Sequence, residues 1–185
     1  VKKMVSYVKG KGRAIRPHGK THKCPDIAKY IIAQGAVGAC SAKLSEAEAF
    51  ADNGVNGLLV TTAVIGKHKI ERAVAIAKKH PDIIYSMDNA QNARDMNDAA
   101  ALAKVKLNVA IDLWVGRRTG IIPGDAAVAL GEAISKLPNL KLHGIQAYAG
   151  HASHTMGFEN RKKVSLEAMT PAVETRFALE KKGIS

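Results

Sequence analysis

Short apolar runs alternate with longer helical patterns along the whole chain, and this alternation limits the possible folds more than any other feature. The apolar runs are nearly continuous, as in "GLLV" at 57–60 and "LNVAIDL" at 107–113. Continuous apolar runs of this length are typical of parallel strands that helices cover. The sequence therefore predicts repeated strand–helix units in an α/β fold.

The predicted elements follow from these patterns, with glycine or proline at most of the junctions between them. Helices are expected at 1–10, 25–35, 45–53, 67–79, 90–103, 124–136 and 160–182. Strands are expected at 13–18, 36–41, 57–61, 83–87, 107–113 and 140–148.

Two architectures fit this order, an open doubly wound sheet and a (β/α)8 barrel. No G-x-G-x-x-G follows the first expected strand, so a dinucleotide-binding open sheet has no support. Polar residues collect just after the strands, where a barrel carries its chemistry. We expect a TIM barrel, seen here incomplete, because a closed barrel needs eight strands. Residues 1–185 are thus expected to form one partial barrel domain. They would be a piece of a longer chain or a sequence that lacks its two ends.

Composition narrows the class of protein. The net charge is +12, but the lysines are scattered and aromatic residues make up only 4% of the chain. We therefore expect no nucleic-acid partner. No apolar run approaches the about 20 residues that span a bilayer, so no membrane partner is expected either. Two cysteines, Cys24 and Cys40, are too few for a disulfide framework, which indicates the cytoplasm.

The stretch "RPHGKTHKCPD" at 16–26 surrounds Lys20 with basic residues and histidines, at the end of an expected strand. A lysine close to other positive groups loses part of its preference for the charged form and becomes a usable nucleophile. This is the environment of a Schiff-base lysine. The alternative is a basic loop that binds phosphate or nothing.

Two later stretches also carry candidate site residues. "IDLWVGRRTGIIPGDAA" places Arg117 and Arg118 after a strand, where a guanidinium could bind an anion or a heteroaromatic nitrogen. A surface pairing of one of these arginines with Asp112 or Asp125 is the alternative.

"GIQAYAGHASH" ends a strand at Tyr148, which suits a pocket floor, and continues to His151 and His154. His154 could act as a general base or a metal ligand. Two histidines complete no zinc site, however, so we expect pocket or surface histidines and no metal ligand within this chain.

Together, "RPHGKTHKC", "AVGACSAKLSEAEAFADNGV", "RRTGI" and "GIQAYAGHASH" resemble the D-threonine aldolase and D-serine dehydratase family, over essentially all 185 residues. The resemblance implies a pyridoxal 5'-phosphate enzyme on the alanine-racemase-type barrel. It implies that Lys20 holds the cofactor as a Schiff base and that His154 acts near the substrate β-hydroxyl. It further implies cofactor contacts from Arg118 at the pyridine nitrogen, and from Tyr148, Gln146 and His18.

The same resemblance implies features outside this sequence. A phosphate-binding loop and the ligands of a divalent metal (Mn, Mg or Zn) are expected beyond Ser185, the latter in a C-terminal β-domain that this chain lacks. A homodimer and a small D-amino acid substrate are also implied.

The function that the resemblance favours is retro-aldol cleavage of a D-β-hydroxy-amino acid, of the D-threonine aldolase or 3-hydroxy-D-aspartate aldolase type. The alternatives are a D-serine or 3-hydroxyaspartate dehydratase of the same family, and a non-catalytic pyridoxal phosphate carrier on the same barrel. Racemase action is less favoured, because it needs a second base that the C-terminal domain normally supplies.

Overall fold

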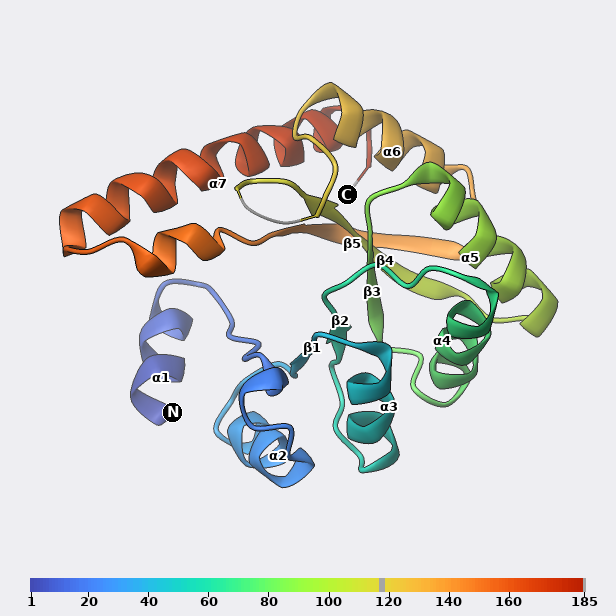
Figure 1. Ribbon diagram of the computed structural model, residues 1–185, viewed down its shortest axis with the longest axis horizontal. Helices are drawn as coiled ribbons and strands as arrows, with labels where there is room; N and C mark the ends of the chain where they lie inside the picture. The colour runs from blue at the N-terminus through green and yellow to red at the C-terminus, as the bar shows by residue number, and fades with distance from the viewer. Residues whose placement is uncertain (117–118, 185) are drawn as a thin grey trace. The chain divides into compact units, whose positions relative to one another are not determined.

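The computed structural model describes residues 1–116 and 119–184 (Figure 1). Within these residues the helices are α1 Lys2–Gly10, α2 Pro25–Ala33, α3 Leu44–Asp52, α4 Lys67–Lys79, α5 Ala90–Ala103, α6 Asp125–Ser135 and α7 Phe158–Lys181, with the short 3₁₀ helices η1 Gly19–Thr21 and η2 Gly150–His154. The strands are β1 Cys40–Ser41, β2 Leu59–Val60, β3 Ile84–Met87, β4 Leu107–Leu113 and β5 Leu140–Ala147. The described strands number five and are parallel, and helices connect them. The predicted strand–helix alternation is therefore confirmed.

The chain divides into two compact units, Val1–Tyr85 and Ser86–Ser185. The expectation of one partial barrel domain over 1–185 stays a prediction. No helix of the described part of the chain is long and apolar enough to cross a membrane.

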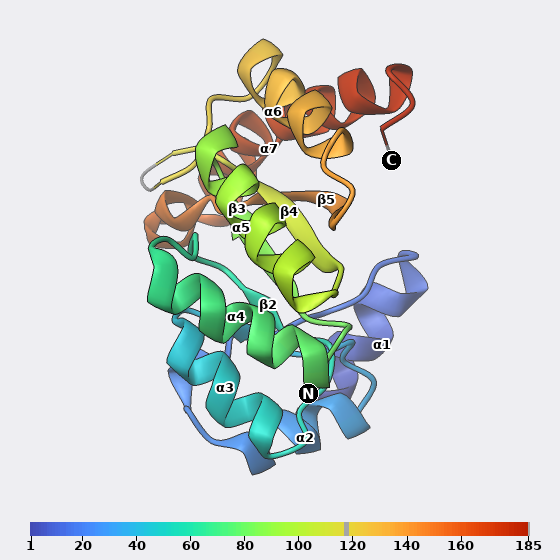
Figure 2. The same ribbon diagram turned by 90° about the vertical axis from the view of Figure 1, so that its right-hand side faces the viewer.

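In the first unit, β1 pairs with β2 and β2 with β3, all in parallel. Helix α3 packs on β1, β2 and α4, and Figure 2 shows α3 and α4 side by side. The core of the unit includes Leu58, Val60 and the fully buried Tyr85, whose hydroxyl donates a 2.7 Å hydrogen bond to the Ala73 carbonyl. This bond satisfies the one polar atom that the tyrosine side chain brings into the core.

In the second unit, β4 and β5 pair in parallel along their lengths, with a register shift between Val109 and Ala110. Helix α6 packs on both strands and on α7 (Figure 1). Strand β4 is buried at every position except Asn108, which agrees with the continuous apolar run in its sequence. The carboxyl ends of β4 and β5 lead into the two later candidate stretches.

The predicted strand at 13–18 is wrong as a regular strand. The segment is joined to β1 by an isolated parallel bridge between His18 and Cys40, and Pro17 accepts a hydrogen bond from the Cys40 backbone N–H. Proline has no N–H to donate, so the segment cannot continue a regular ladder through Pro17.

The strands at 36–41 and 57–61 are shorter than predicted. Gly38 and Gly57 both have positive φ, and a Cβ on Gly38 would overlap the Gly57 carbonyl. The two backbones thus touch where only glycines fit, and regular pairing begins after them, at Cys40 and Leu59.

Candidate active site

Lys20 lies on η1, a single 3₁₀ turn that follows the extended segment beside β1. Its side chain is exposed, while the preceding Gly19 is buried. A Cβ on Gly19 would overlap the ring of Phe50, a buried residue of α3. The turn therefore sits directly on the first unit's core, and the missing side chain at Gly19 lets it approach.

His18 caps this turn. Its Nδ1 accepts the Lys20 backbone N–H at 3.2 Å, and its Nε2 lies 3.3 Å from Thr61 Oγ1, just after β2. On the other side of the lysine, His22 Nδ1 accepts the Cys24 backbone N–H at 3.1 Å. Both histidines of the motif thus fold the chain around Lys20.

Two buried polar atoms next to this turn have no hydrogen-bond partner within the described residues, Arg16 Nε and Ser41 Oγ. Buried polar groups are nearly always satisfied, so such atoms mark places for a ligand or water. Cys40, beside them, donates from Sγ to the Arg16 carbonyl at 3.5 Å. Burial raises the pKa of the Cys40 thiol, and the nearby Arg16 charge offsets part of that rise.

In the second unit, Gln146 of β5 is held at both ends of its amide. Its Nε2 donates to Asp112 Oδ1 at 2.6 Å, and its Oε1 accepts from Ser86 Oγ at 3.1 Å. Asp112 and Ser86 are buried, on β4 and β3. Asp112 also accepts a 3.4 Å bond from Thr119 at its second oxygen. These contacts form one polar network at the carboxyl ends of the strands.

Arg117 and Arg118 lie outside the described residues. Two backbone hydrogen bonds join the described residues on either side. Trp114 donates its N–H to the Ile121 carbonyl, and Ile121 donates to the Asp112 carbonyl, both at 2.9 Å. Trp114 and Ile121 are thus tied to each other and to the end of β4.

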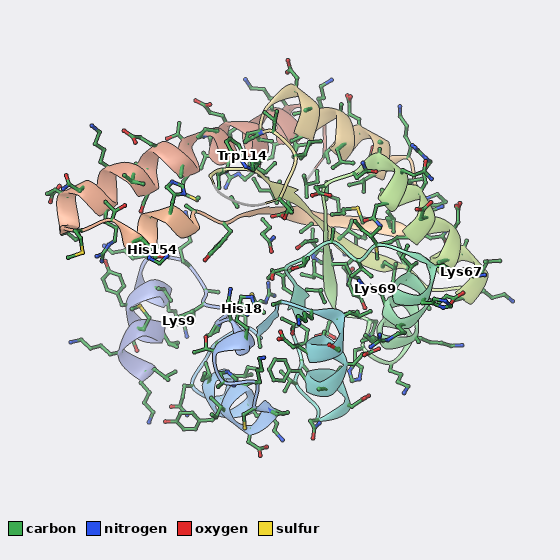
Figure 3. All side chains as sticks on the ribbon, in the orientation of Figure 1. Lys9, His18, Lys67, Lys69, Trp114 and His154 are labelled. Carbon is green, nitrogen blue, oxygen red and sulfur yellow. The ribbon has the colours of Figure 1, made fainter. Side chains whose placement is uncertain are left out.

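Tyr148, His151 and His154 follow β5. Tyr148 is half exposed and folds back over Gly150, where a Cβ would overlap its ring. His151 packs in the same way on Gly116, and its buried Nδ1 has no partner within residues 1–116 and 119–184. His154 is exposed at the end of η2, ahead of α7 (Figure 3).

The predicted site residues therefore fall into two described sets. His18 and Lys20 meet on one turn of the first unit, whereas Gln146, Tyr148 and His154 belong to the end of β5 and the segment after it in the second. In the part of the chain that the structure describes, no three His, Cys, Asp or Glu side chains group so that they could hold a metal ion.

Sequence reasoning did not identify three hydrogen-bonding roles. Thr61 contacts His18, and Ser86 and Asp112 both contact Gln146. Each lies at or just after the end of an apolar strand. A polar residue at that position is the signal that could have found them, because parallel strands place their carboxyl ends at one edge.

The first unit contains groups that could bind a cofactor with an aldehyde and a phosphate. It presents an exposed primary amine on a fixed turn, next to Arg16 Nε and the buried Ser41 hydroxyl, two atoms that have no partner among the described residues. An amine binds an aldehyde covalently, and hydrogen-bond donors bind anionic groups. The residues present thus fit pyridoxal phosphate.

Comparison with known proteins agrees with this arrangement. Residues 1–183 match the model of the alanine racemase N-terminal domain. A 3-hydroxy-D-aspartate aldolase of Paracoccus denitrificans (strain Pd 1222) is 36% identical over 187 residues, which cover 100% of this chain and 48% of that protein. A D-threonine aldolase of Arthrobacter sp. is 32% identical over 93% of this chain and 45% of its own length.

Among solved structures, the D-threonine aldolase of Filomicrobium marinum matches with a TM-score of 0.96 and 34% identity, over 100% of this chain and 50% of that one. The chain thus spans about half the length of the relatives that it matches. Its parallel strands with flanking helices are an incomplete barrel of the alanine-racemase type, as the sequence predicted. This chain belongs to the alanine racemase N-terminal domain family.

Proposed function

We propose that the protein containing this chain is a pyridoxal phosphate-dependent lyase that cleaves the Cα–Cβ bond of D-β-hydroxy-amino acids. The observation that carries the proposal is the exposed Lys20 amine on a histidine-capped turn, next to buried polar atoms without partners within the described residues. The relatives named as D-threonine aldolase and 3-hydroxy-D-aspartate aldolase support the choice of reaction.

When bound, pyridoxal phosphate supplies the electron sink for the bond cleavage, and the protein supplies binding and orientation. Lys20 would hold the cofactor covalently through its Nζ. Arg118 would lie at the ring nitrogen, where its planar, permanently charged group is a fixed donor. Tyr148, Gln146 and His18 would complete the cofactor contacts.

His154 would take the proton from the β-hydroxyl of the substrate as the Cα–Cβ bond breaks. An imidazole suits this task because it accepts and releases protons near neutral pH. The exposure of His154 at the end of η2 supports the proposal, since a general base must reach the substrate.

Three further features belong to this proposal. We infer a divalent metal (Mn, Mg or Zn) held by residues outside this chain, and a homodimer, both from the family resemblance. We also infer a cytoplasmic location, which Cys24 and Cys40 support as free thiols, because thiols persist in a reducing compartment.

Product analysis on the full-length protein loaded with cofactor and metal tests the proposed reaction. D-threonine should yield glycine and acetaldehyde, and 3-hydroxy-D-aspartate should yield glycine and glyoxylate. Pyruvate from D-serine, or oxaloacetate from 3-hydroxyaspartate, with release of ammonia, would show a dehydratase instead. Cofactor binding with no turnover of any of these amino acids would favour a carrier.

A further inference from the structure

His18 makes two hydrogen bonds whose polarity is set by its neighbours. On one side of the ring, Nδ1 faces the backbone N–H of Lys20 at 3.2 Å. On the other side, Nε2 faces Thr61 Oγ1 at 3.3 Å. The Thr61 hydroxyl in turn donates to the Ser41 carbonyl at 3.1 Å.

The contacts with Lys20, Thr61 and Ser41 favour one arrangement of protons. A backbone N–H can only donate, so His18 Nδ1 must accept and carry no proton. A neutral imidazole then carries its proton on Nε2, which needs an acceptor. Thr61 Oγ1 is that acceptor, because its own hydrogen is directed to the Ser41 carbonyl.

The other two forms of the ring fit these contacts less well. A proton on Nδ1, either in the second neutral tautomer or in the imidazolium, would place two donors against each other at the Lys20 backbone N–H. Thr61 is buried, and Ser41 is fully buried, so water has little access to the far end of this chain of hydrogen bonds. A buried polar group without a hydrogen-bond partner is costly, which favours the neutral ring with its proton on Nε2.

We propose that His18 is a positioning residue for Lys20: a neutral imidazole, protonated on Nε2, that fixes the turn carrying the lysine to Thr61. The role of Lys20 as the cofactor lysine rests on the proposed function. His18 supports the turn from one side and the Gly19–Phe50 contact supports it from the other. The backbone that carries Lys20 is thereby fixed on both flanks.

The protonation of His18 can be read directly by nitrogen NMR of the full-length protein labelled with ¹⁵N-histidine, with the His18→Asn spectrum identifying the signals. The expected result is a neutral ring at neutral pH with the proton on Nε2, with and without cofactor. A proton on Nδ1, or a charged ring, would overturn the proposal.

Matched variants test the role of Thr61. Thr61→Val removes the acceptor with little change of volume, so the His18 Nε2 signal should shift, and the cofactor dissociation constant should rise about fivefold, the factor for one hydrogen bond of ordinary strength. Thr61→Ser should restore both. Thr170→Val is the control, since that exposed hydroxyl donates to the Leu166 carbonyl of its own helix, away from the turn of Lys20 in the chain. An unchanged His18 signal in Thr61→Val would contradict the proposal.

Two substitutions of His18 separate its two bonds. Asn places an oxygen where Nδ1 accepts the Lys20 N–H but does not reach Thr61, whereas Gln reaches Thr61 but does not cap the turn. His18→Asn should therefore keep more of the cofactor affinity than His18→Gln, and the reverse order would contradict a positioning role through the turn. If the wild type binds no cofactor on Lys20, the proposed function fails, while the NMR result still decides the His18 tautomer.

Discussion

The Asp112 carboxylate accepts a 2.6 Å hydrogen bond from the side-chain amide of Gln146, across the paired strands β4 and β5. An ionised carboxylate has no hydrogen to donate, so the bond fixes which end of the Gln146 amide faces β4. The amide oxygen is then turned to Ser86, whose hydroxyl donates to it. A predicted cofactor contact is thus oriented by a buried aspartate.

Replacement of Asp112 by leucine should destabilise the protein by about 1–3 kcal/mol, because the half-buried Gln146 amide loses its carboxylate partner. Asp112→Asn should cost less, since an amide still offers an oxygen to Gln146. The midpoint of urea unfolding measures both, at unchanged slope. Equal midpoints for the leucine and asparagine variants would show that the carboxylate's hydrogen bonds contribute little.

Gly19→Ala should destabilise the first unit by about 1–3 kcal/mol, the usual cost of inserting a methyl group into a packed site. The added Cβ meets the Phe50 ring, so Phe50→Leu in the same chain should recover part of the loss. Thermal unfolding of the two single variants and the double variant gives the coupling. Gly10→Ala is a matched control, because a Cβ there has nothing within 4 Å. Additive losses would contradict the contact.

Borohydride reduction of the full-length holoprotein should attach the cofactor to the peptide that contains Lys20. The reason is the place of Lys20 on the turn that His18 caps, since Lys23 and Lys43 are also exposed but lie outside that turn. Peptide mass spectrometry identifies the labelled residue, and Lys20→Ala should abolish the label. Label on Lys23 or Lys43 would make the assignment wrong.

Arg118→Lys should leave the cofactor bound but lower turnover, since a point charge does not reproduce the planar fork of a guanidinium at a ring nitrogen. Arg118 lies outside the described residues, so this prediction rests on the sequence resemblance. Cofactor absorbance and steady-state kinetics separate binding from turnover. Arg117→Lys is the matched comparison. If only this variant loses turnover, Arg117 and not Arg118 is the residue at the ring nitrogen.

His154→Ala should reduce cleavage of D-threonine by about 10²–10⁴-fold, the range for loss of a general base. Exchange of the α-proton of a D-amino acid with solvent should survive, because in this proposal it needs Lys20 and the cofactor but not His154. Product analysis and deuterium exchange on the same variant provide the two measurements. A parallel fall of both activities would assign His154 a structural role only.

Local patterns predicted the helices closely. Helices α4 and α5 begin and end where the sequence predicted them, at 67–79 and 90–103. Asn89 shows why: its side chain accepts the backbone N–H groups of Gln91 and Asn92, so an asparagine ahead of the helical pattern fixes the start of α5. Periodicity and capping are properties of neighbouring residues, and the sequence displays them directly.

The sequence by itself determined the strand–helix order, the parallel sheet and the lysine motif, because these depend on hydrophobic periodicity and on residues close in the chain. Only the tertiary structure decided that 13–18 is no regular strand, that His18 meets Thr61 and that Gln146 meets Asp112. The partners in the last two pairs lie 43 and 34 residues apart. Such contacts depend on which strand ends the packing brings together, and a side chain's hydrogen-bond partner is therefore fixed by the fold around it.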